Sequence, residues 1–315
     1  MIRLGLVVVL LPGLILAGVR QHPGGKRLPH DKYIRVVSEA ESPVERHYIP
    51  SKDGLYIAAA IRKPKGPGPF PVFLHFHGAP GGRGMDKLVS WALGTTGGPV
   101  WERFLQEGYV VVVADYRASN FRTLGQPVPE GVATMADDGV SVVEYMGKLP
   151  YVDPERIHVY GVSLGGDVTM HIISRTRVRA AILGAGAPMT YLSLRGLGPP
   201  GKDVTPAQRA EFFRTAPIDM NLVGPRLQAV SCPLMILVGT DDGLMGLSER
   251  LHDLLEQAGK PVRLEVYENG YHDFVMGPQG HPGRDEPLMD ITLDALEEAL
   301  RFFRNPSEPP PSAPH

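Results

Sequence analysis

Residues 157–166, IHVYGVSLGG, decide the fold of this 315-residue chain. Ile157 to Tyr160 predict a buried strand, and the residues that follow the glycine-rich turn have the pattern of a helix up to about Arg175. Ser163 lies between two glycines in a G-x-S-x-G pattern, which suits a chain that turns sharply from strand to helix. We therefore predict that the Ser163 hydroxyl is exposed at the C-terminal end of a strand, near the positive end of a helix.

Strands and helices alternate along most of the chain. Other apolar runs predict strands at 71–76, 109–114, 180–183, 234–238 and 262–267. Helical spacing of apolar residues appears at 100–106, 135–149, 247–258 and 289–303. Several of these strands are apolar throughout, so both of their faces must be buried, as in a mainly parallel sheet with helices on both faces. The sequence therefore predicts an α/β fold, to which the Asp53-Gly54 pair adds an antiparallel hairpin.

Composition excludes several classes of protein. The 37 glycines and 31 prolines would interrupt long helices, whereas a hydrophobic content of 43% is too high for a chain that is disordered throughout. The formal net charge is −2 and no basic run is present, so we expect no nucleic-acid partner. The single cysteine, Cys232, precedes Pro233 at the start of an apolar run, and we predict a buried thiol without a catalytic role.

The N-terminal segment has the character of an export signal. Residues 4–19 are uncharged, but they are fewer than the about 20 that a membrane-spanning helix needs. The small residues Ala17 and Gly18 favour cleavage of a signal peptide at 1–18, which would give a periplasmic or secreted protein. The alternative is an uncleaved anchor at 4–19, which would be the protein's membrane contact. The expected organisation is a signal or anchor at 1–18, an N-terminal extension at 19–46, one domain at 47–304 and a disordered Pro-rich tail at 305–315.

The stretch at about 188–230 breaks the alternation of strands and helices. It is rich in glycine and proline, and it contains one predicted helix near 207–214. We expect a small lid inserted over one end of the sheet. Apolar residues such as Met189, Tyr191 and Leu192 either pack this lid or line a pocket, and packing is the favoured interpretation.

A serine nucleophile needs a general base, and that base needs a carboxylate to orient it. The strand at 234–238 leads to Asp241 and Asp242, so both carboxylates lie at a strand's C-terminal end, where sites collect. His272 lies in the loop after the next strand, and no other of the eleven histidines has that placement. We therefore predict His272 as the base and favour Asp242 over Asp241 as the orienting acid.

Residues 75–82, HFHGAPGG, directly follow a buried strand. A loop in this place can present backbone N–H groups to an oxyanion, and we predict Ala79 (or Gly78) and Leu164 as the donors. The competing interpretation is a metal site, because His75 and His77 would share one face of the strand. No third ligand with suitable spacing is apparent, so we predict no metal and expect His77 to brace the loop by hydrogen bonding.

Five segments in this order resemble the α/β-hydrolase superfamily. They are HFHGAPGG at 75–82, DYRAS at 115–119, DPERIHVYGVSLGG at 153–166, LMILVGTDD at 234–242 and YENGYHDF at 267–274. More narrowly, they resemble the catalytic domain of the prolyl oligopeptidase (S9) family and the dienelactone-hydrolase-like esterases, over about residues 47–304. The resemblance implies an α/β-hydrolase fold with Ser163 as nucleophile, Asp242 as triad acid and His272 as base, and it implies no cofactor.

The resemblance also has departures. Ala79 and Ala118 stand where the family pattern has glycine, although a backbone N–H remains at Ala79. About 28 residues separate the expected signal from the first hairpin strand, too few for the β-propeller of the oligopeptidases.

We therefore expect a serine hydrolase acting on small esters or amides, with carboxylesterase-like activity slightly favoured. The alternatives are a serine peptidase acting on short peptides and, more remotely, a non-catalytic binding protein with the same fold. The sequence gives no indication of an oligomeric state.

Overall fold

The computed structural model describes residues 19–22, 36–79, 82–94, 100–116, 131–201, 203–272, 274–276 and 289–308. The expected signal or anchor at 1–18 lies outside these residues, as does the tail from residue 309 onward. Within the described residues, no helix combines the length and the apolar character needed to span a membrane.

The described residues form a nine-stranded sheet in the order β1-β9-β8-β7-β6-β4-β5-β3-β2. Only the β2–β3 and β3–β5 pairs are antiparallel. The strands are β1 (Val19–His22), β2 (Glu45–Pro50), β3 (Tyr56–Arg62), β4 (Phe70–Phe76), β5 (Val110–Ala114), β6 (Val152–Val162), β7 (Ala180–Gly184), β8 (Leu234–Gly239) and β9 (Val262–Tyr267). The predicted α/β fold with a mainly parallel sheet is confirmed, and so is the predicted hairpin, which is formed by β2 and β3.

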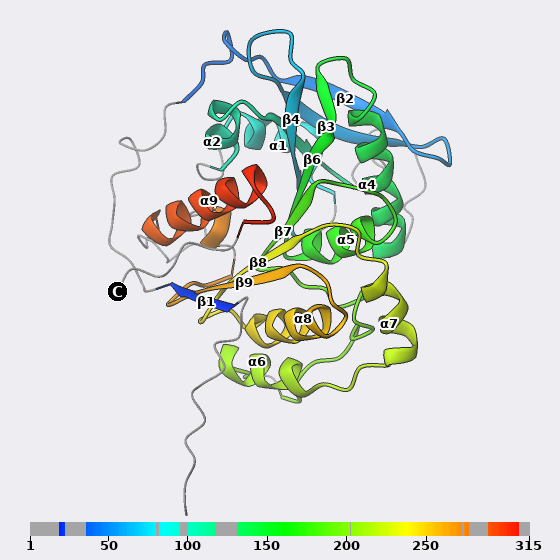
Figure 1. Ribbon diagram of the computed structural model, residues 1–315, viewed down its shortest axis with the longest axis vertical. Helices are drawn as coiled ribbons and strands as arrows, with labels where there is room; N and C mark the ends of the chain where they lie inside the picture. Colours follow the sequence, from blue (N-terminus) through cyan, green and yellow to red (C-terminus); the bar gives the residue numbers. More distant parts are fainter. Residues whose placement is uncertain are drawn as a thin grey trace, which may run out of the picture.

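Helices cover both faces of the sheet, as Figure 1 shows for α2 and α9 on the left and α4 and α5 on the right. The helices are α1 (Met85–Ala92), α2 (Val100–Gln106), α4 (Val132–Met146), α5 (Leu164–Ile173), α6 (Pro206–Thr215), α7 (Met220–Gln228), α8 (Met245–Gln257) and α9 (Met289–Arg304), with a short 3₁₀ helix η3 (Phe274–Met276). Side chains of β4 alternate between two buried cores, because successive residues of a strand point to opposite faces. Val72 and Leu74 join the core beneath α4, α5 and α8, whereas Phe73 joins the core beneath α1, α2 and α9.

The first strand of the sheet lies in the segment expected as an N-terminal extension. β1 pairs in parallel with β9 at the edge of the sheet, with Val19 opposite Leu264. A cluster of ionic side chains surrounds it: Arg20 contacts Glu298 at 2.6 Å, and His22 contacts Glu265 at 2.8 Å. β1 therefore joins the sheet through tertiary contacts that its four-residue sequence does not reveal.

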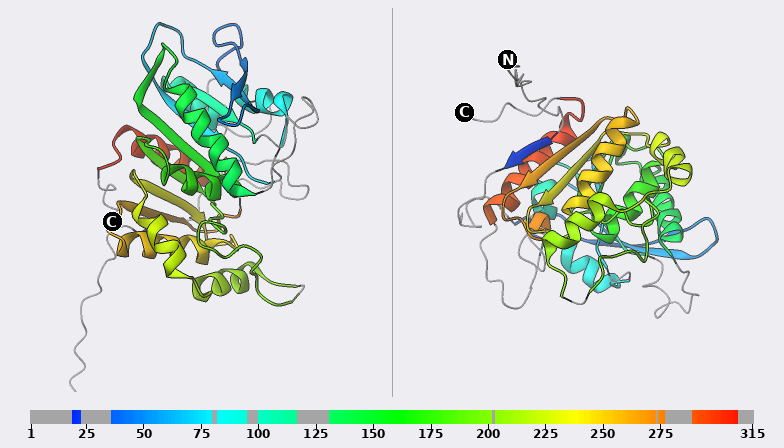
Figure 2. Two further views of the ribbon diagram at one scale, coloured as in Figure 1. Left: turned by 90° about the vertical axis from the view of Figure 1, so that its right-hand side faces the viewer. Right: turned by 90° about the horizontal axis from the view of Figure 1, so that it is seen from below.

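The inserted segment at 188–230 contains two helices rather than the single predicted one. α6 begins with a capping box, in which the Thr205 side chain accepts a hydrogen bond from the backbone N–H of Gln208. The sequence pattern does not predict α7, because this helix contains Pro225 and proline usually interrupts a helix. Figure 2 shows α6 and α7 grouped at the β8–β9 side of the molecule, where α6 packs against α8.

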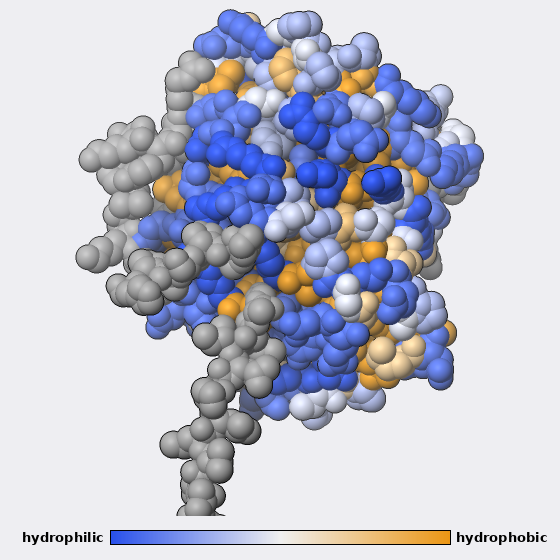
Figure 3. All heavy atoms as spheres, in the orientation of Figure 1, coloured by the Kyte–Doolittle hydropathy of each residue, from blue (hydrophilic) through white to orange (hydrophobic). Residues whose placement is uncertain are grey.

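Three apolar residues at the start of the insertion, Met189, Tyr191 and Leu192, pack rather than line a cavity. Tyr191 and Leu192 are fully buried in the core, and Met189 packs against it. Cys232 is also buried, as predicted, and burial raises the pKa of its thiol to about 12. The surface is mainly hydrophilic on the face in Figure 3, and exposed large hydrophobic side chains such as Met220 and Leu222 on α7 are few.

Candidate active site

Ser163 occupies the sharp turn between β6 and α5. Its backbone has φ 51° and ψ −116°, a conformation that side-chain-bearing residues rarely adopt and that stores strain of about 1–3 kcal/mol. A Cβ on Gly161 would lie 2.3 Å from the carbonyl oxygen of Gly165, and a Cβ on Gly165 would lie 2.0 Å from that of Phe76. The two glycines are therefore required by close backbone approach, which holds Ser163 at the end of the strand.

The structure brings Ser163, His272 and Asp242 into hydrogen-bond contact. The Oγ atom of Ser163 lies 3.0 Å from Nε2 of His272, and Nδ1 of the same ring lies 3.0 Å from Oδ2 of Asp242. Ser163 and His272 are 109 positions apart in the sequence. The three residues nevertheless lie close together because they follow the parallel strands β6, β8 and β9, whose C-terminal ends share one edge of the sheet. The His272 side chain is 39% exposed, whereas that of Asp242 is 2% exposed.

Asp242 and Asp241 differ in their surroundings. Asp242 is buried, and its second carboxylate oxygen accepts a hydrogen bond of 2.9 Å from the backbone N–H of Leu244. Asp241 is exposed, and its backbone N–H donates to the carbonyl of Gly270. Asp241 therefore helps to join the two loops through its backbone, and Asp242 is the carboxylate that contacts His272.

The loop after β4 passes directly over the serine. A Cβ on Gly78 would lie 3.1 Å from Cβ of Ser163. Leu164 is the first residue of α5, and the first N–H groups of a helix have no acceptor within it. The three residues predicted as donors to an oxyanion therefore lie at two backbone segments on either side of Ser163, with Ala79 next to Gly78 in the wall of the adjoining cavity.

His77 braces this loop through Asp115, a residue whose role the sequence pattern alone did not indicate. The Nε2 atom of His77 lies 2.9 Å from Oδ1 of Asp115, and its Nδ1 atom lies 2.7 Å from the carbonyl oxygen of Gly78. Oδ2 of Asp115 accepts hydrogen bonds from the backbone N–H groups of Arg83 and Gly84, each at 2.8 Å. An acid directly after the apolar strand β5 was the available signal for this role.

Asp167 forms a second link that was not predicted. This buried side chain on α5 accepts hydrogen bonds from the backbone N–H groups of Thr190 (2.9 Å) and Tyr191 (3.0 Å). Burial raises the pKa of Asp167 above its ordinary value. The helix that begins at Ser163 is thereby tied to the start of the inserted segment.

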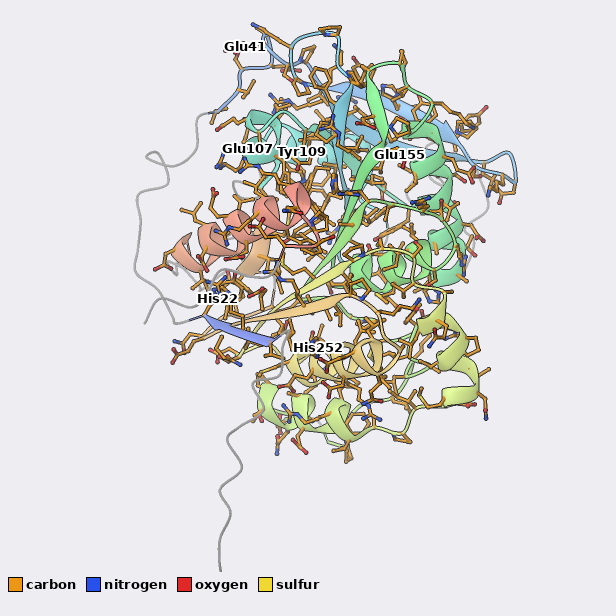
Figure 4. All side chains as sticks on the ribbon, viewed as in Figure 1. His22, Glu41, Glu107, Tyr109, Glu155 and His252 are labelled. Carbon is orange, nitrogen blue, oxygen red and sulfur yellow. The ribbon has the colours of Figure 1, made fainter. Side chains whose placement is uncertain are left out.

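His75 has different surroundings from His77, its proposed partner in the alternative metal site. His75 is fully buried, and burial followed by the proximity of His77 lowers its pKa to about 3. Within the described part of the chain, no group of three or more His, Cys, Asp or Glu side chains is arranged to hold a metal ion. Two other histidines labelled in Figure 4 lie on other elements: His22 on β1, beside Glu265, and His252 on α8, beside Asp253.

Two cavities meet at His272. The first, of about 280 Å³, is lined by His75, His77, Gly78, Ala79, Arg83, Trp91, Trp101, Val162, Ser163, His272 and Met276. The second, of about 330 Å³, is lined by Val204, Pro206 and Arg209 of the inserted segment together with Asp242, Gly243, Leu244 and His272. There is thus space on two sides of His272, one cavity formed by the sheet and its helices and the other partly by the inserted segment.

Comparison with known proteins agrees with this geometry. The sequence model of the prolyl oligopeptidase family (peptidase S9) matches residues 101–288, more than half of the chain. A protein named "uncharacterized peptidase YuxL" from Bacillus subtilis is 26% identical over 266 residues, which is 80% of this chain and 38% of the relative. The chain spans less than half the length of the curated relatives that it matches first.

Solved structures share the fold at low sequence identity. An esterase from the archaeon Pyrobaculum calidifontis is 18% identical with a TM-score of 0.57, covering 84% of this chain and 86% of the esterase. The acylaminoacyl peptidase of Pyrococcus horikoshii is also 18% identical, with a TM-score of 0.58, covering 90% of this chain and 44% of the peptidase. Dienelactone hydrolase-like structures share the fold as well. The chain therefore belongs to the prolyl oligopeptidase family of serine hydrolases.

Proposed function

We propose that this protein hydrolyses small esters through an acyl-enzyme formed on Ser163. The observation that carries the proposal is the continuous hydrogen-bonded path from Ser163 Oγ through His272 to Asp242, with 3.0 Å at each step. An alkyl hydroxyl becomes an effective nucleophile when an adjacent base can take its proton, and the distance to Nε2 is within reach of that transfer.

In the first half of the reaction, Ser163 Oγ attacks the substrate carbonyl while its proton moves to Nε2 of His272. The Nδ1–H group of His272 donates to Asp242, which fixes the tautomer with its lone pair toward the serine and stabilises the ring when it becomes charged. Asp242 can do this because its buried carboxylate is itself oriented by the backbone N–H of Leu244. His272 then gives the proton to the leaving group, and the acyl-enzyme remains.

The carbonyl oxygen gains negative charge as the tetrahedral intermediate forms. We assign its donors to the backbone N–H of Leu164, at the positive end of α5, and to that of Ala79 or Gly78 in the loop above Ser163. His77 and Asp115 hold this loop in place through their 2.9 Å contact. In the second half, His272 takes a proton from water as the water attacks the acyl-enzyme. His272 then returns the proton to Ser163 Oγ as the acyl bond breaks and the acid is released.

We favour an ester over a peptide bond because structures named as esterases and as a dienelactone hydrolase are among those that share this fold. The inserted segment, with α6 beside the second cavity, contributes lining residues to the site within this one domain. A serine peptidase acting on short peptides is the second candidate, and the family model supports it.

The test compares kcat/KM for p-nitrophenyl acetate and butyrate with kcat/KM for alanyl and glycyl-prolyl p-nitroanilides, using Ser163→Ala as the background. The proposal predicts faster turnover of the esters, abolished by the substitution. Turnover confined to the anilides would replace the ester assignment by the peptidase. A folded protein that turns over neither class would support the binding-protein alternative.

We also propose that residues 1–18 direct export and are removed. The support is the short uncharged run with small residues at Ala17 and Gly18, together with the position of Val19 as the first residue of β1. Cleavage after Gly18 would leave the described sheet complete. Cell fractionation with mass spectrometry of the mature N-terminus tests this proposal: a soluble exported chain beginning at or near Val19 supports it, and an intact chain in the membrane fraction supports the anchor.

A further inference from the structure

The wall of the first cavity carries polar atoms that the triad does not use. His75 lies on β4, two residues before His77, and it lines the same cavity as Ser163. Among the described residues, neither ring nitrogen of His75 has a hydrogen-bond partner, and the side chain is buried. Buried polar groups in folded proteins are nearly always paired, and exceptions gather at functional sites. His75 is therefore a polar group with unmet hydrogen-bonding capacity next to the nucleophile.

Two tryptophans near His75, Trp91 and Trp101, also carry polar atoms without a hydrogen-bond partner among the described residues. Trp101 meets the His75 ring edge-on at 5.3 Å and 86°, and Trp91 stacks on Trp101 at 6.2 Å. Both indoles line the cavity, and within the described residues neither indole N–H has an acceptor. Val162 and Met276 complete the apolar part of the lining. Among the described residues, the cavity thus combines aromatic walls with two unpaired indole N–H donors, the unpaired Nε–H of Arg83 and one imidazole.

The chemistry of His75 narrows what can bind. Burial keeps its pKa at about 3, so the ring is uncharged at neutral pH and offers one donor nitrogen and one acceptor nitrogen. A carboxylate has no proton for the acceptor nitrogen and would lose its hydration beside an uncharged ring. A simple hydrocarbon would leave every polar atom unpaired. A hydroxyl group both donates and accepts, and it matches the neutral imidazole beside an indole N–H.

The cavity is large enough for one substituent of a substrate but not for a whole drug-sized molecule. Its volume of about 280 Å³ lies just below the roughly 300–1,000 Å³ of pockets that hold a whole drug-sized molecule. Arg83, a charged residue in the lining, is engaged only in part. Its Nη2 donates to the carbonyl of Ala79 at 2.6 Å and its guanidinium lies 5.7 Å over the Trp91 ring, whereas its buried Nε has no partner among the described residues.

We propose that this cavity is a specificity pocket for a hydroxyl-bearing aromatic group of the substrate, such as a phenol, held against the wall that Trp91 and Trp101 form and hydrogen-bonded to His75. The inference rests on the proposed function, since it names the substrate class of the same site. A site built around unpaired polar groups discriminates against the analogue that lacks the matching group, because those groups then stay unsatisfied.

The test uses three esters that differ at one position. They are the p-nitrophenyl esters of 3-(4-hydroxyphenyl)propanoate, 3-(4-methoxyphenyl)propanoate and 3-phenylpropanoate, with the matching 3-arylpropyl acetates to place the ring on the other side of the scissile bond. In at least one series, we expect kcat/KM for the phenol to exceed that for both analogues by about tenfold or more. The methoxy group can accept a hydrogen bond but cannot donate one. A lower kcat/KM for the methoxy ester than for the phenol therefore indicates that the phenol donates to the acceptor nitrogen of His75.

Variants separate recognition from folding. In His75→Phe, the phenol-to-phenyl ratio of kcat/KM should fall to roughly one, and His75→Asn should restore part of it. Trp101→Phe keeps a ring but removes one N–H, so the ratio should fall by roughly threefold or more. His158→Phe is the matched control: this buried histidine on the neighbouring strand β6 bonds to the carbonyl of Val72 away from the cavity, and its replacement should leave the ratio as in the wild type.

The outcomes distinguish the two proposals. Hydrolysis of all three esters at equal kcat/KM in both series, or a phenol preference that survives in His75→Phe, overturns the specificity pocket and leaves the hydrolase assignment intact. If the folded wild type hydrolyses none of these esters, the proposed function itself is wrong.

Discussion

Two histidines in this protein each lie between two partners, yet the partners differ in kind. His22, on the edge strand β1, has a carboxylate at each ring nitrogen: Glu265 and Asp294, both at 2.8 Å. His272 has a carboxylate at one nitrogen and the Ser163 hydroxyl at the other, each at 3.0 Å. Two carboxylates need two N–H donors, so His22 is suited to hold its proton. One carboxylate and one hydroxyl leave a nitrogen that can accept a proton.

The surroundings of His22 and His272 differ as well. The His22 ring is buried and stacks on Tyr267 at 4.1 Å. Burial lowers the pKa of His22, but the hydrogen bonds to Asp294 and Glu265 outweigh it and raise the pKa above its ordinary value. His272 is partly exposed and lies where two cavities meet. His272 has a hydroxyl partner and lines both cavities, which suits its proposed role as a base, whereas His22 is enclosed between two carboxylates, which suits a structural role.

The largest effect is expected from the carboxylate that orients His272. Asp242→Asn would turn an amide toward Nδ1 and favour the wrong tautomer, and kcat should fall by about 10⁴-fold. The matched control is Asp241→Asn, because Asp241 is the exposed neighbour that contacts the next loop through its backbone. Its kcat should remain within about twofold of the wild type. Equal losses in the two variants, measured by steady-state ester hydrolysis, would contradict the assignment of Asp242.

The next effect is expected at the turn that holds Ser163. In Gly165→Ala, the new Cβ would lie 2.0 Å from the carbonyl oxygen of Phe76, a backbone atom that cannot move aside alone. The free energy of unfolding should fall by about 3 kcal/mol, and activity should fall as well.

Gly147→Ala, at the C-cap of α4, is the control for this substitution. Gly147 has φ −63° and ψ −12°, which alanine adopts freely, and a Cβ there would lie no closer than 3.6 Å to any described atom beyond its chain neighbours, so stability should stay within about 1 kcal/mol of the wild type. Urea denaturation of both variants checks the pair, and similar stabilities for the two would show that β6 and α5 are not held as described.

A smaller effect is expected at the edge strand. His22→Gln should lower the free energy of unfolding by about 1–2 kcal/mol near pH 6 while leaving kcat/KM unchanged. The loss stays below that of a fully buried pair because Asp294 is 53% exposed and Glu265 keeps Arg263 at 2.7 Å.

The pH dependence of this loss has a definite sign. The pKa of His22 is raised in the folded state, so its contribution to stability is fully present below its unfolded pKa of about 6.5 and is lost as the pH rises through the folded value. The stability difference between the wild type and His22→Gln should therefore narrow between pH 6 and pH 9 in urea denaturation. A difference that grows over this range would contradict the proposed protonation of His22.

The sequence was sufficient for the parts of the molecule that depend on local pattern. Apolar strands and the Asp53-Gly54 turn predict the sheet and its hairpin, and both are present. The contact among Ser163, His272 and Asp242 was also predictable, because the loops that follow parallel strands meet at one edge of the sheet.

Other features depend on contacts between distant segments and could not be predicted in this way. β1 carries Arg20 and His22 and has no apolar pattern, so only its ion pairs with residues more than 240 positions away show why it joins the sheet. α7 contains Pro225, and packing of its buried residues outweighs this local signal. The cavity around His75 arises where two helices place Trp91 and Trp101 against β4.

Covalent labelling can show whether Ser163 is a nucleophile that His272 activates. Purified wild type, Ser163→Ala and His272→Gln would be treated with a fluorophosphonate probe, and the adduct would be located by peptide mass spectrometry. We expect a single adduct on Ser163 in the wild type, none in Ser163→Ala and labelling slower by about 10³-fold or more in His272→Gln. Equal labelling of the wild type and Ser163→Ala, or an adduct on another residue, would contradict the assignment of Ser163 as the nucleophile.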